Sequence, residues 1–477
     1  MANPYTSFVG RDYTARFQAI ITLLQAEVPG LTDLNYSGIA NVFCRLLASE
    51  SDYGAFYQDE AYEETSLSYA KFKQSLVDLA TTVDQLPLLA SSAQDLLTVT
   101  WAAGVTPVDT HIPIYSQCYR GDGLSYLTTV ATTFYATQTS IQIPIIQGTL
   151  VTLTPSYTDF TASDMTGRLT YDLGPNVCAG SVSVSHGTAP VVQWTQVDSF
   201  WQSQPTDYHF LLVLVPDGPN GETDAVALTL GNGTQGCQQF IGPMTVTFVR
   251  TDGANGNCGP GVVTNPPSSL TGIISITNAA PLRGGGSAEG TESLRARIPA
   301  ATHIQRRAVS DADYTPLIMT YVPGILDVQA ADRTTLPTMP YLYDAIYVVP
   351  QGGPPLSSLM KSQILSVCQQ RGRLGDWEGR YLVLDPTLTP VNVGVTIGIA
   401  NGYDPSPVVS AVTAIIQSTL AVPNQVINGT LSYGNLFTSV SNTPGVRYAN
   451  FATPIADMNA GIGELFVPGV ITVTVGP

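Results

Sequence analysis

Three adjacent glycines, Gly284, Gly285 and Gly286, lie in a chain of 477 residues at the point where its residue pattern changes. Before them, short apolar and β-branched runs alternate with Gly, Pro and Asn, and after them helical and strand patterns alternate. Glycine has no Cβ and accepts backbone conformations that other residues avoid. We therefore predict a hinge at Gly284–Gly286 between two differently built halves of the chain.

Signals for two helices and a strand follow the glycines. Glu292 is placed where a carboxylate interacts favourably with the N-terminal end of a helix dipole. Ser310 and Asp313 have the spacing of a capping box. Pro323 and Gly324 predict the end of the second helix, and a strand is expected to follow.

The first hundred or so residues have the apolar spacing of helices. Residues 17–24 and 39–47 each repeat apolar side chains at helical intervals. Pro29 and Gly30 predict the end of the first helix, and Ser37 is a candidate N-cap for the second. A further helix is expected around residues 76–83.

A fourth, short helix is predicted before the pattern changes. The residues from Ser92 to Asp95 resemble a capping box, and Gly104 would end the helix. From about Val105 onward, short β-branched runs separated by turn residues indicate an antiparallel β-domain. Its candidate strands are Tyr126–Val130, Ser140–Ile143, Val182–Ser185, Phe210–Val215, Ala225–Leu230, Met244–Val249 and Ile273–Ile276.

The last part of the chain alternates strands and helices. This alternation suggests two strand–helix–strand units of a ferredoxin-like α+β kind. The tail Val470–Val475 is expected to be a strand that pairs with another edge. The expected strands are Ile325–Ala330, Ala345–Val349, Val391–Ile399 and Val446–Phe451, and the expected helices are Ser357–Arg371, Pro405–Leu420 and Tyr433–Val440.

The predicted fold class is therefore multidomain α+β. We expect a helical N-terminal domain at residues 1–104 and a β-rich domain at 105–282. The glycine hinge with a helical α+β domain would occupy 283–345, and a ferredoxin-like α+β domain with a terminal strand would occupy 346–477.

The charge balance restricts the partners of the chain. The net charge is −17, and only 12% of the residues are charged. An acidic chain repels phosphate backbones, so nucleic-acid binding is not expected. A polar but uncharged surface is suited to burial in a large assembly, because its desolvation costs less than that of charges.

The sequence also gives expectations about the compartment. The residues from Met1 to Thr6 have neither a basic nor an apolar signal region, and the most apolar run, Phe210–Val215, is too short to cross a bilayer. We expect a soluble protein made in a cytosol, without a membrane contact. Unpaired thiols are expected at Cys44, Cys118, Cys178, Cys237, Cys258 and Cys368.

Neither a catalytic nor a cofactor site is expected from the motifs. Gly231–Gly236 matches G-x-G-x-x-G, but Gly242 and Pro243 follow closely, so a glycine-rich hairpin turn is a better interpretation than a dinucleotide site. The run at Gly284 lacks the Lys and Ser/Thr of a phosphate-binding loop, so a hinge or a tight passage of the backbone is a better interpretation than a phosphate site. The four histidines are isolated, and no metal site is expected.

Five arginines form a basic island in this acidic chain. They indicate a docking surface for an acidic partner or a neighbouring copy. The alternative is that they lie on solvated helix faces, with local ion pairs to Glu289 and Glu292 that contribute little to stability. The island consists of Arg283, Arg295, Arg297, Arg306 and Arg307.

The segment from Gly284 to Arg295, then 307–314 and Pro323-Gly324, resembles the core motif of baseplate J-like proteins. These are baseplate wedge proteins of contractile-tail phages and related contractile injection systems. Segments 121–129, 197–210, 230–233 and 253–261 are similar to the family in the same order. The helical N-terminal residues match no motif of the family, and Asp109–Gln117 lacks its usual glycine-threonine loop.

The resemblance implies a structural role in the virion. Members of the family link the central hub and sheath platform to peripheral tail proteins, in six-fold arrays with two copies in each wedge. They rearrange when the sheath contracts. The N-terminal helices would bundle with partner proteins, and the particle would be assembled in the host bacterial cytoplasm.

A role without enzymatic activity is therefore expected, with no cofactor. The first alternative is a receptor- or glycan-binding tail protein, which would need an aromatic platform, whereas Trp101, Trp194, Trp201 and Trp377 are scattered. The second is a tail-associated hydrolase, whose turnover would depend on a carboxylate.

Overall fold

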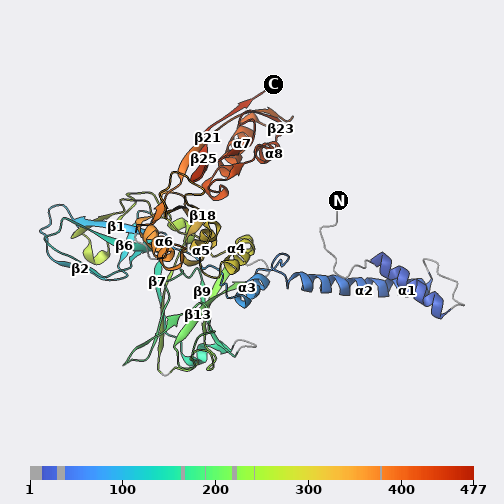
Figure 1. The fold of residues 1–477 in the computed structure, drawn as a ribbon, viewed down its shortest axis with the longest axis horizontal. Helices are drawn as coiled ribbons and strands as arrows, with labels where there is room; N and C mark the ends of the chain where they lie inside the picture. The colour runs from blue at the N-terminus through green and yellow to red at the C-terminus, as the bar shows by residue number, and fades with distance from the viewer. Residues whose placement is uncertain are drawn as a thin grey trace. The chain divides into compact units, whose positions relative to one another are not determined.

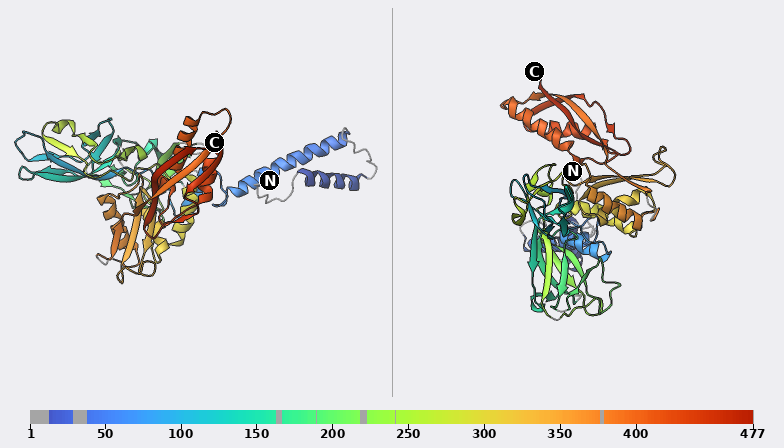
Figure 2. Two further views of the ribbon diagram at one scale, coloured as in Figure 1. Left: turned by 90° about the horizontal axis from the view of Figure 1, so that it is seen from above. Right: turned by 90° about the vertical axis from the view of Figure 1, so that its left-hand side faces the viewer.

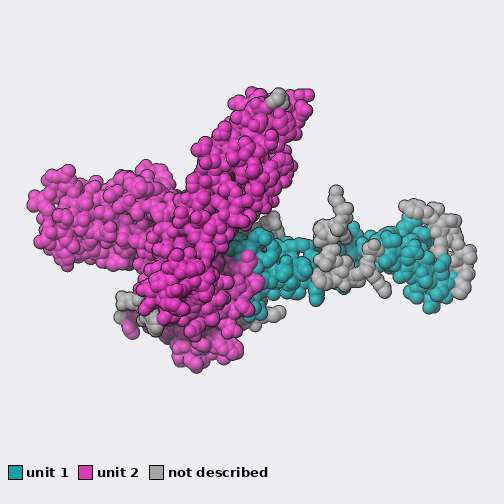
Figure 3. All heavy atoms as spheres, turned by 45° about the horizontal axis from the view of Figure 1, so that its top comes forward, with its two compact units in different colours: residues 1–84, 216–223, 290–295 teal, residues 85–215, 224–289, 296–477 magenta. Residues whose placement is uncertain are grey.

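The computed structural model describes residues 13–28, 38–162, 167–188, 190–217, 223–240, 242–375 and 379–476. The chain forms two compact units, shown in different colours in Figure 3. The smaller unit contains residues 1–84, 216–223 and 290–295, and the larger one contains the rest. Mixed helices and sheets in several modules confirm the predicted multidomain α+β class (Figure 1).

The smaller unit is built mainly from three helices, as the apolar spacing predicts. Helices α1 and α2 contact each other, and α3 corresponds to the helix expected around residues 76–83. Gly38 is the N-cap of α2. Pro29, Gly30 and Ser37, the predicted helix boundaries, lie outside the described residues. The helices are α1 Tyr13–Glu27, α2 Ile39–Glu63 and α3 Lys73–Thr82.

The short helix predicted between Ser92 and Gly104 is wrong, because this segment forms a strand. Strand β1 spans Gln94–Trp101 and pairs antiparallel with β6 (Ser140–Gln147) and β17 (Ile274–Thr277). Leu97 and Val99 are both buried, so the segment follows the two-residue period of a strand. β1 therefore belongs with the β-rich region, although the predicted boundary at residue 104 leaves it outside.

A six-stranded sheet has the order β16-β3-β4-β6-β1-β17. Its neighbouring strands are antiparallel, and its strands contribute Leu97, Tyr126 and Ile143 to one buried apolar cluster. A two-stranded ladder of β2 and β5 accompanies it. The remaining strands of this part are β2 Thr110–Ile112, β3 Gln117–Arg120, β4 Ser125–Thr128, β5 Thr132–Phe134 and β16 Val263–Asn265.

Two further sheets, with the orders β11-β10-β15-β7 and β12-β13-β14-β9-β8, share a second core. Side chains from both sheets, such as Phe210 and Phe248, lie in one buried cluster, as in a β-sandwich. The predicted strands in this region are confirmed. The strands are β7 Thr149–Leu153, β8 Thr161–Ala162, β9 Leu169–Pro175, β10 Ser183–His186, β11 Val192–Gln193, β12 Thr195–Gln196, β13 His209–Asp217, β14 Thr223–Leu230 and β15 Met244–Arg250.

The first α+β module follows the glycine run. Its sheet has the order β18-β19-β20, with α5 and α6 packed on one apolar core. The Ser357 hydroxyl caps α6 by accepting a hydrogen bond from the Met360 N–H. The predicted boundary at residue 345 falls inside β19. The elements are α4 Thr291–His303, α5 Tyr314–Tyr321, β18 Ile325–Ala331, β19 Asp344–Pro350, α6 Ser358–Arg371 and β20 Tyr381–Leu384.

The second α+β module carries the last long strand (Figure 2). Its sheet has the order β23-β21-β25, and α7 and α8 share a core with it. Each module therefore has a principal sheet of three described strands, where the βαββαβ pattern has four. The elements are β21 Thr387–Ile399, α7 Pro405–Thr419, β22 Thr430–Leu431, α8 Tyr433–Ser441, β23 Val446–Thr453, β24 Met458–Asn459 and β25 Glu464–Val475.

Candidate assembly site

The glycine run is hydrogen-bonded to segments that are distant in the sequence. The Gly284 N–H donates to the Gln351 carbonyl oxygen at 2.9 Å, beyond the end of β19. Gly286 and Ser91 exchange two backbone hydrogen bonds at 2.9 and 3.0 Å, just before β1. The run thus holds the start of the β-rich region against the first α+β module.

The middle glycine, Gly285, is bound by one side chain. The amide of Asn257 accepts a hydrogen bond from the Gly285 N–H at 2.9 Å and donates to its carbonyl oxygen at 2.8 Å. Asn257 follows the short 3₁₀ turn Gly253–Gly256 of the β-rich region. Each of the three glycine N–H groups therefore has a partner.

Close approach of backbone explains why glycine is needed here. A Cβ on Gly285 would overlap the Gly253 carbonyl oxygen, and one on Gly324 would overlap the Gly284 carbonyl oxygen. Gly284 also has a φ of +93°, which disfavours other residues. A single conformation does not test the predicted hinge, which stays a prediction. The contacts themselves describe a tightly packed junction.

A buried ion pair lies directly after this junction. The Arg297 guanidinium binds the Glu289 carboxylate through two hydrogen bonds of 2.8 Å, and the two side chains are 3% and 2% exposed. Glu289 also accepts a hydrogen bond from the Leu88 N–H at 3.0 Å, and Arg297 donates to the Leu86 carbonyl oxygen at 2.9 Å. The pair therefore fixes residues 86–88, which lead into β1, to helix α4.

The capping box predicted at Ser310 and Asp313 is present. The Asp313 carboxylate accepts hydrogen bonds from the N–H groups of Val309 and Ser310 at 2.9 and 2.8 Å. This turn places Tyr314 in the core, where its hydroxyl donates to the Asp344 carboxylate at 2.8 Å. The motif thus directs an aromatic side chain to a buried charge.

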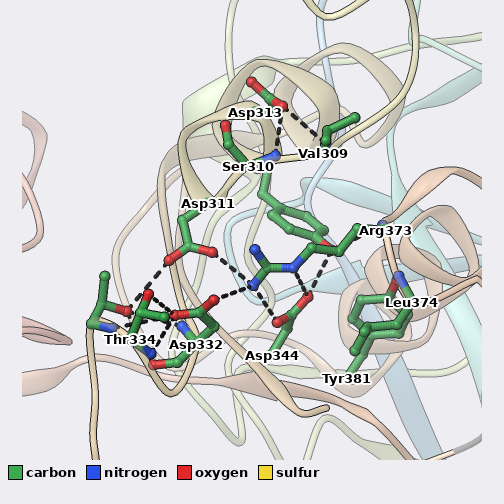
Figure 4. A network of polar contacts seen from close by, with 12 residues as sticks. Val309, Ser310, Asp311, Asp313, Asp332, Thr334, Asp344, Arg373, Leu374 and Tyr381 are labelled. Carbon is green, nitrogen blue, oxygen red and sulfur yellow. Dashed lines mark hydrogen bonds and ion pairs between the residues drawn. The ribbon is translucent and has the colours of Figure 1, made fainter.

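One guanidinium, that of Arg373, lies among three carboxylates (Figure 4). Asp344 is 1% exposed and accepts hydrogen bonds from two nitrogens of Arg373. Asp311 and Asp332 lie 2.8 and 3.2 Å from the Arg373 Nη2 atom. These contacts tie the ends of β18, β19 and α6 together, so the cluster holds the module in one arrangement.

The pKa values in this cluster favour the charges observed. Burial alone would lower the pKa of Arg373, but the hydrogen bonds and charge of Asp344 raise it overall. Burial and the Asp344 carboxylate raise the pKa of the Tyr314 hydroxyl. The Thr334 hydroxyl is the main cause of the lowered pKa of Asp332. Arg373 stays a cation and Tyr314 stays a donor throughout the physiological pH range.

The five arginines of the predicted docking surface lie in different environments. Arg297 is buried against Glu289, so it is not available to a partner in this structure. Arg295 pairs with Glu292 and donates to the Ala70 carbonyl oxygen, and Arg283 is half-buried. The Arg306 side chain is 41% exposed and lies 3.7 Å from Asp198, and Arg307 is exposed. The docking prediction therefore remains for Arg306 and Arg307.

Helix α2 presents large apolar side chains to solvent. Its buried residues are Asn41, Cys44, Ala48, Ala55 and Glu63, and none of them is a large apolar side chain. Contiguous exposed apolar surface of this kind marks interaction sites. The apolar spacing of this stripe predicts the helix but does not reveal that, among the described residues, nothing covers the stripe. The exposed stripe comprises Ile39 at 77%, Phe43 at 61%, Leu46 at 60%, Leu47 at 59%, Tyr53 at 62%, Phe56 at 50% and Tyr57 at 67%.

The G-x-G-x-x-G sequence is a tight turn. The Gly233 N–H donates to the Gly236 carbonyl oxygen at 3.0 Å, and a Cβ on Gly231 would overlap Gly236. No helix follows it among residues 231–240 and 242–250. The hairpin prediction is also wrong, because β14 and β15 on either side belong to different sheets of the sandwich.

The described histidines and cysteines give no metal group. Within the ranges that the structure describes, no three His, Cys, Asp or Glu side chains are arranged to hold a metal ion. His186 accepts a hydrogen bond from the Trp194 Nε1 atom at 2.8 Å and belongs to an aromatic cluster. All six cysteines are unpaired, as predicted.

The other candidate surfaces are a cavity and the tryptophans. A cavity of about 600 Å³ is lined by serines and glutamines together with apolar side chains such as Ile146, Val322 and Val367, and its lining contains no carboxylate and no histidine. Trp194 is buried and Trp101 stacks on Phe134, whereas Trp201 is 79% exposed. Trp377 lies outside the described residues. In the described part of the chain, no helix is long and apolar enough to span a membrane.

No family model and no curated protein matches this chain. Among solved structures, it is similar to a chain of the anti-feeding prophage baseplate, with 14% identity over 96% of this chain and 90% of the other, at a TM-score of 0.34. It is also similar to a chain of the type VI secretion TssK-TssF-TssG baseplate subcomplex, with 8% identity over 72% and 96%, at a TM-score of 0.27. Both TM-scores are below 0.5.

Proposed function

We propose that this chain is a structural component of the baseplate of a contractile tail or injection machine, and that it acts by protein–protein assembly, without catalysis. The observation that carries the proposal is the exposed apolar stripe of α2. The resemblance of the segment from Gly284 to Gly324 to baseplate J-like proteins supplies the kind of assembly.

The stripe is too apolar to be explained as ordinary solvated surface. Removing a large apolar side chain from water contributes about 1.5–3 kcal/mol, and Phe43, Leu46, Leu47, Phe56 and Tyr57 are each at least half exposed. A partner helix with a complementary apolar face would cover them, as in a helical bundle. The proposed partners of α2 are therefore helices of other baseplate proteins.

The finer role that we propose is that of a wedge protein. Two copies in each of six wedges would link the central hub and sheath platform to peripheral proteins, and would rearrange when the sheath contracts. The hydrogen-bonded junction at Gly284–Gly286 and the ion pair of Glu289 with Arg297 support rigid modules that move as bodies. The protein would be located in the tail baseplate of the virion, after assembly in the host bacterial cytoplasm.

The stripe can be tested with one substitution and a matched control. Leu46→Asp places a charge in the stripe, and Gln58→Asp places the same charge at an exposed polar position of the same helix. We expect Leu46→Asp to abolish co-purification with the neighbouring tail proteins and Gln58→Asp to preserve it. Equal binding by both variants would contradict the proposed role of α2.

A further inference from the structure

Strand β25 has one paired edge and one open edge. It lies at the edge of the sheet β23-β21-β25, parallel to β21 (Figure 1). The Gly476 N–H donates to the Ile397 carbonyl oxygen of β21 at 2.8 Å. Because backbone groups alternate along a strand, Ile471, Val473 and Val475 direct their N–H and C=O groups away from β21. Among the described residues, no strand pairs with that outer edge.

The open edge lacks the usual protection against pairing. Residues 470–475 are Val-Ile-Thr-Val-Thr-Val, all β-branched, with no charge and no proline. Natural edge strands are commonly protected by lysine, proline, bulges or a covering loop. Pro468 precedes this stretch and lies opposite Val391, where the register with β21 shifts. It therefore leaves residues 470–475 unprotected.

The two faces of the stretch are distinct. Ile471 and Val473 pack into the core that the sheet shares with α7. Val475 continues this face and is 48% exposed. On the other face, Thr472 and Thr474 are exposed, and the Thr474 hydroxyl lies 2.9 Å from that of Thr396.

We propose that a second copy of the chain pairs with this edge, β25 against β25, in antiparallel orientation around a two-fold axis at Val473. The three-stranded sheets of the two copies would then form one continuous sheet with the helices on the same face. This pairing rests on the proposed assembly, which supplies the second copy. It adds the place at which the two copies meet.

The register follows from the alternation of the strand. Residues directly opposite each other in an antiparallel pair point to the same face, so a two-fold axis through Val473 places Ile471 opposite Val475 and Thr472 opposite Thr474. The outward backbone groups of Ile471, Val473 and Val475 then find partners. Val475 is covered by the Ile471 of the other copy. This register sets apolar side chains against apolar ones and threonine against threonine, with no charge opposed to another, so the edge is complementary to a second copy of itself.

Two double variants test the register in the purified full chain. Thr472→Lys with Thr474→Lys places lysine opposite lysine in both cross-strand pairs, and Thr472→Lys with Thr474→Glu places lysine opposite glutamate. Circular dichroism would establish that both fold. By sedimentation over a range of concentrations, we expect wild type to dimerise. The Lys/Lys variant should dimerise at least 10-fold more weakly, and the Lys/Glu variant should remain a dimer.

A cross-linking readout tests the same pairing independently of affinity. Thr472 and Thr474 would face each other in non-hydrogen-bonded pairs, where the Cβ atoms are close enough for a disulfide. Thr472→Cys with Thr474→Cys should give a disulfide-linked dimer on oxidation, whereas the control Thr396→Cys, one strand further in, should not. A monomeric wild type without cross-linking, or equal dimerisation of both charge variants, would overturn the proposal. Binding to other tail proteins is a separate measurement, so a failure of the β25 pairing and a failure of the baseplate role give different experimental results.

Discussion

Glu289 and Arg297 face each other in a bidentate ion pair that is almost completely withdrawn from solvent. Eight residues apart in the sequence, they lie at the end of the glycine segment and in helix α4. Glu289 also accepts a hydrogen bond from the Leu88 N–H, and Arg297 donates one to the Leu86 carbonyl oxygen. The pair therefore connects the segment that follows the glycine run with residues 86–88, which lead into β1.

Breaking this pair from one side should destabilise the larger unit. Glu289→Gln leaves the Arg297 charge buried without its partner, which costs about 3–5 kcal/mol. The control Glu292→Gln breaks the exposed pair with Arg295 and should cost less than about 1 kcal/mol. Urea unfolding followed by fluorescence compares the two. Equal midpoints for both variants would contradict the structural role of the buried pair.

The loss of stability caused by a substitution in the glycine junction should depend on the space available for a side chain at that position. Gly285→Ala forces a Cβ against the Gly253 carbonyl oxygen and is expected to destabilise by about 1–3 kcal/mol. Gly290→Ala, five residues on, meets nothing within 4 Å and serves as the control. Thermal unfolding measures both. A Gly285→Ala protein as stable as the control would show that the junction is looser than described.

The structure of the glycine run could be predicted from the sequence only in part. Three adjacent glycines predict a backbone position that other residues cannot occupy. Conformational freedom and close packing both require glycine, so the sequence does not distinguish a hinge from a packed junction. The contacts with Gly253, Asn257 and Ser91 show close packing. The N–H groups of Gly284, Gly285 and Gly286 all donate hydrogen bonds, so the run is held in place at each of its three residues.

Helices and strands with a clear period were predicted well, and one segment was not. The capping-box pattern at Ser92–Asp95 suggested a helix. The segment instead forms strand β1, because it pairs with β6 and β17, which are far away in the sequence. The cluster of Arg373 with Asp311, Asp332 and Asp344 was missed for a related reason. Its members come from separate elements, so no local spacing reveals them.

The Arg373 cluster predicts a stability loss at alkaline pH. The pKa of Tyr314 is raised in the folded protein, so its stabilisation is complete below the unfolded tyrosine pKa of about 10 and decreases as the pH rises above it. Tyr314→Phe removes both the hydrogen bond to Asp344 and this titration. We expect it to lower stability at pH 7 by about 1–3 kcal/mol and to reduce the loss between pH 9 and 11.

Thermal midpoints of wild type and Tyr314→Phe, measured from pH 7 to 11, check this prediction. Parallel decreases in both proteins would show that other groups control the alkaline transition. Burial also raises the pKa of the Tyr126 hydroxyl, so the same measurement on Tyr126→Phe shows whether a second buried tyrosine contributes to the alkaline transition.

The exposed arginines should act in binding rather than in folding. Charge reversal at Arg306 and Arg307 is expected to release an acidic partner without lowering the melting temperature, because neither side chain is buried. Arg447→Glu, another exposed arginine, is the matched control. Co-purification that persists after the double reversal would contradict the docking prediction.

If this chain is an assembly component of a baseplate, it should bind its neighbours in the tail. Light scattering of the purified chain, alone and mixed with the tail proteins encoded beside it, measures this binding. We predict a stable complex of fixed stoichiometry in which α2 is protected from proteolysis. A chain that keeps its own mass in every mixture, with α2 still open to proteolysis, would contradict the proposed function.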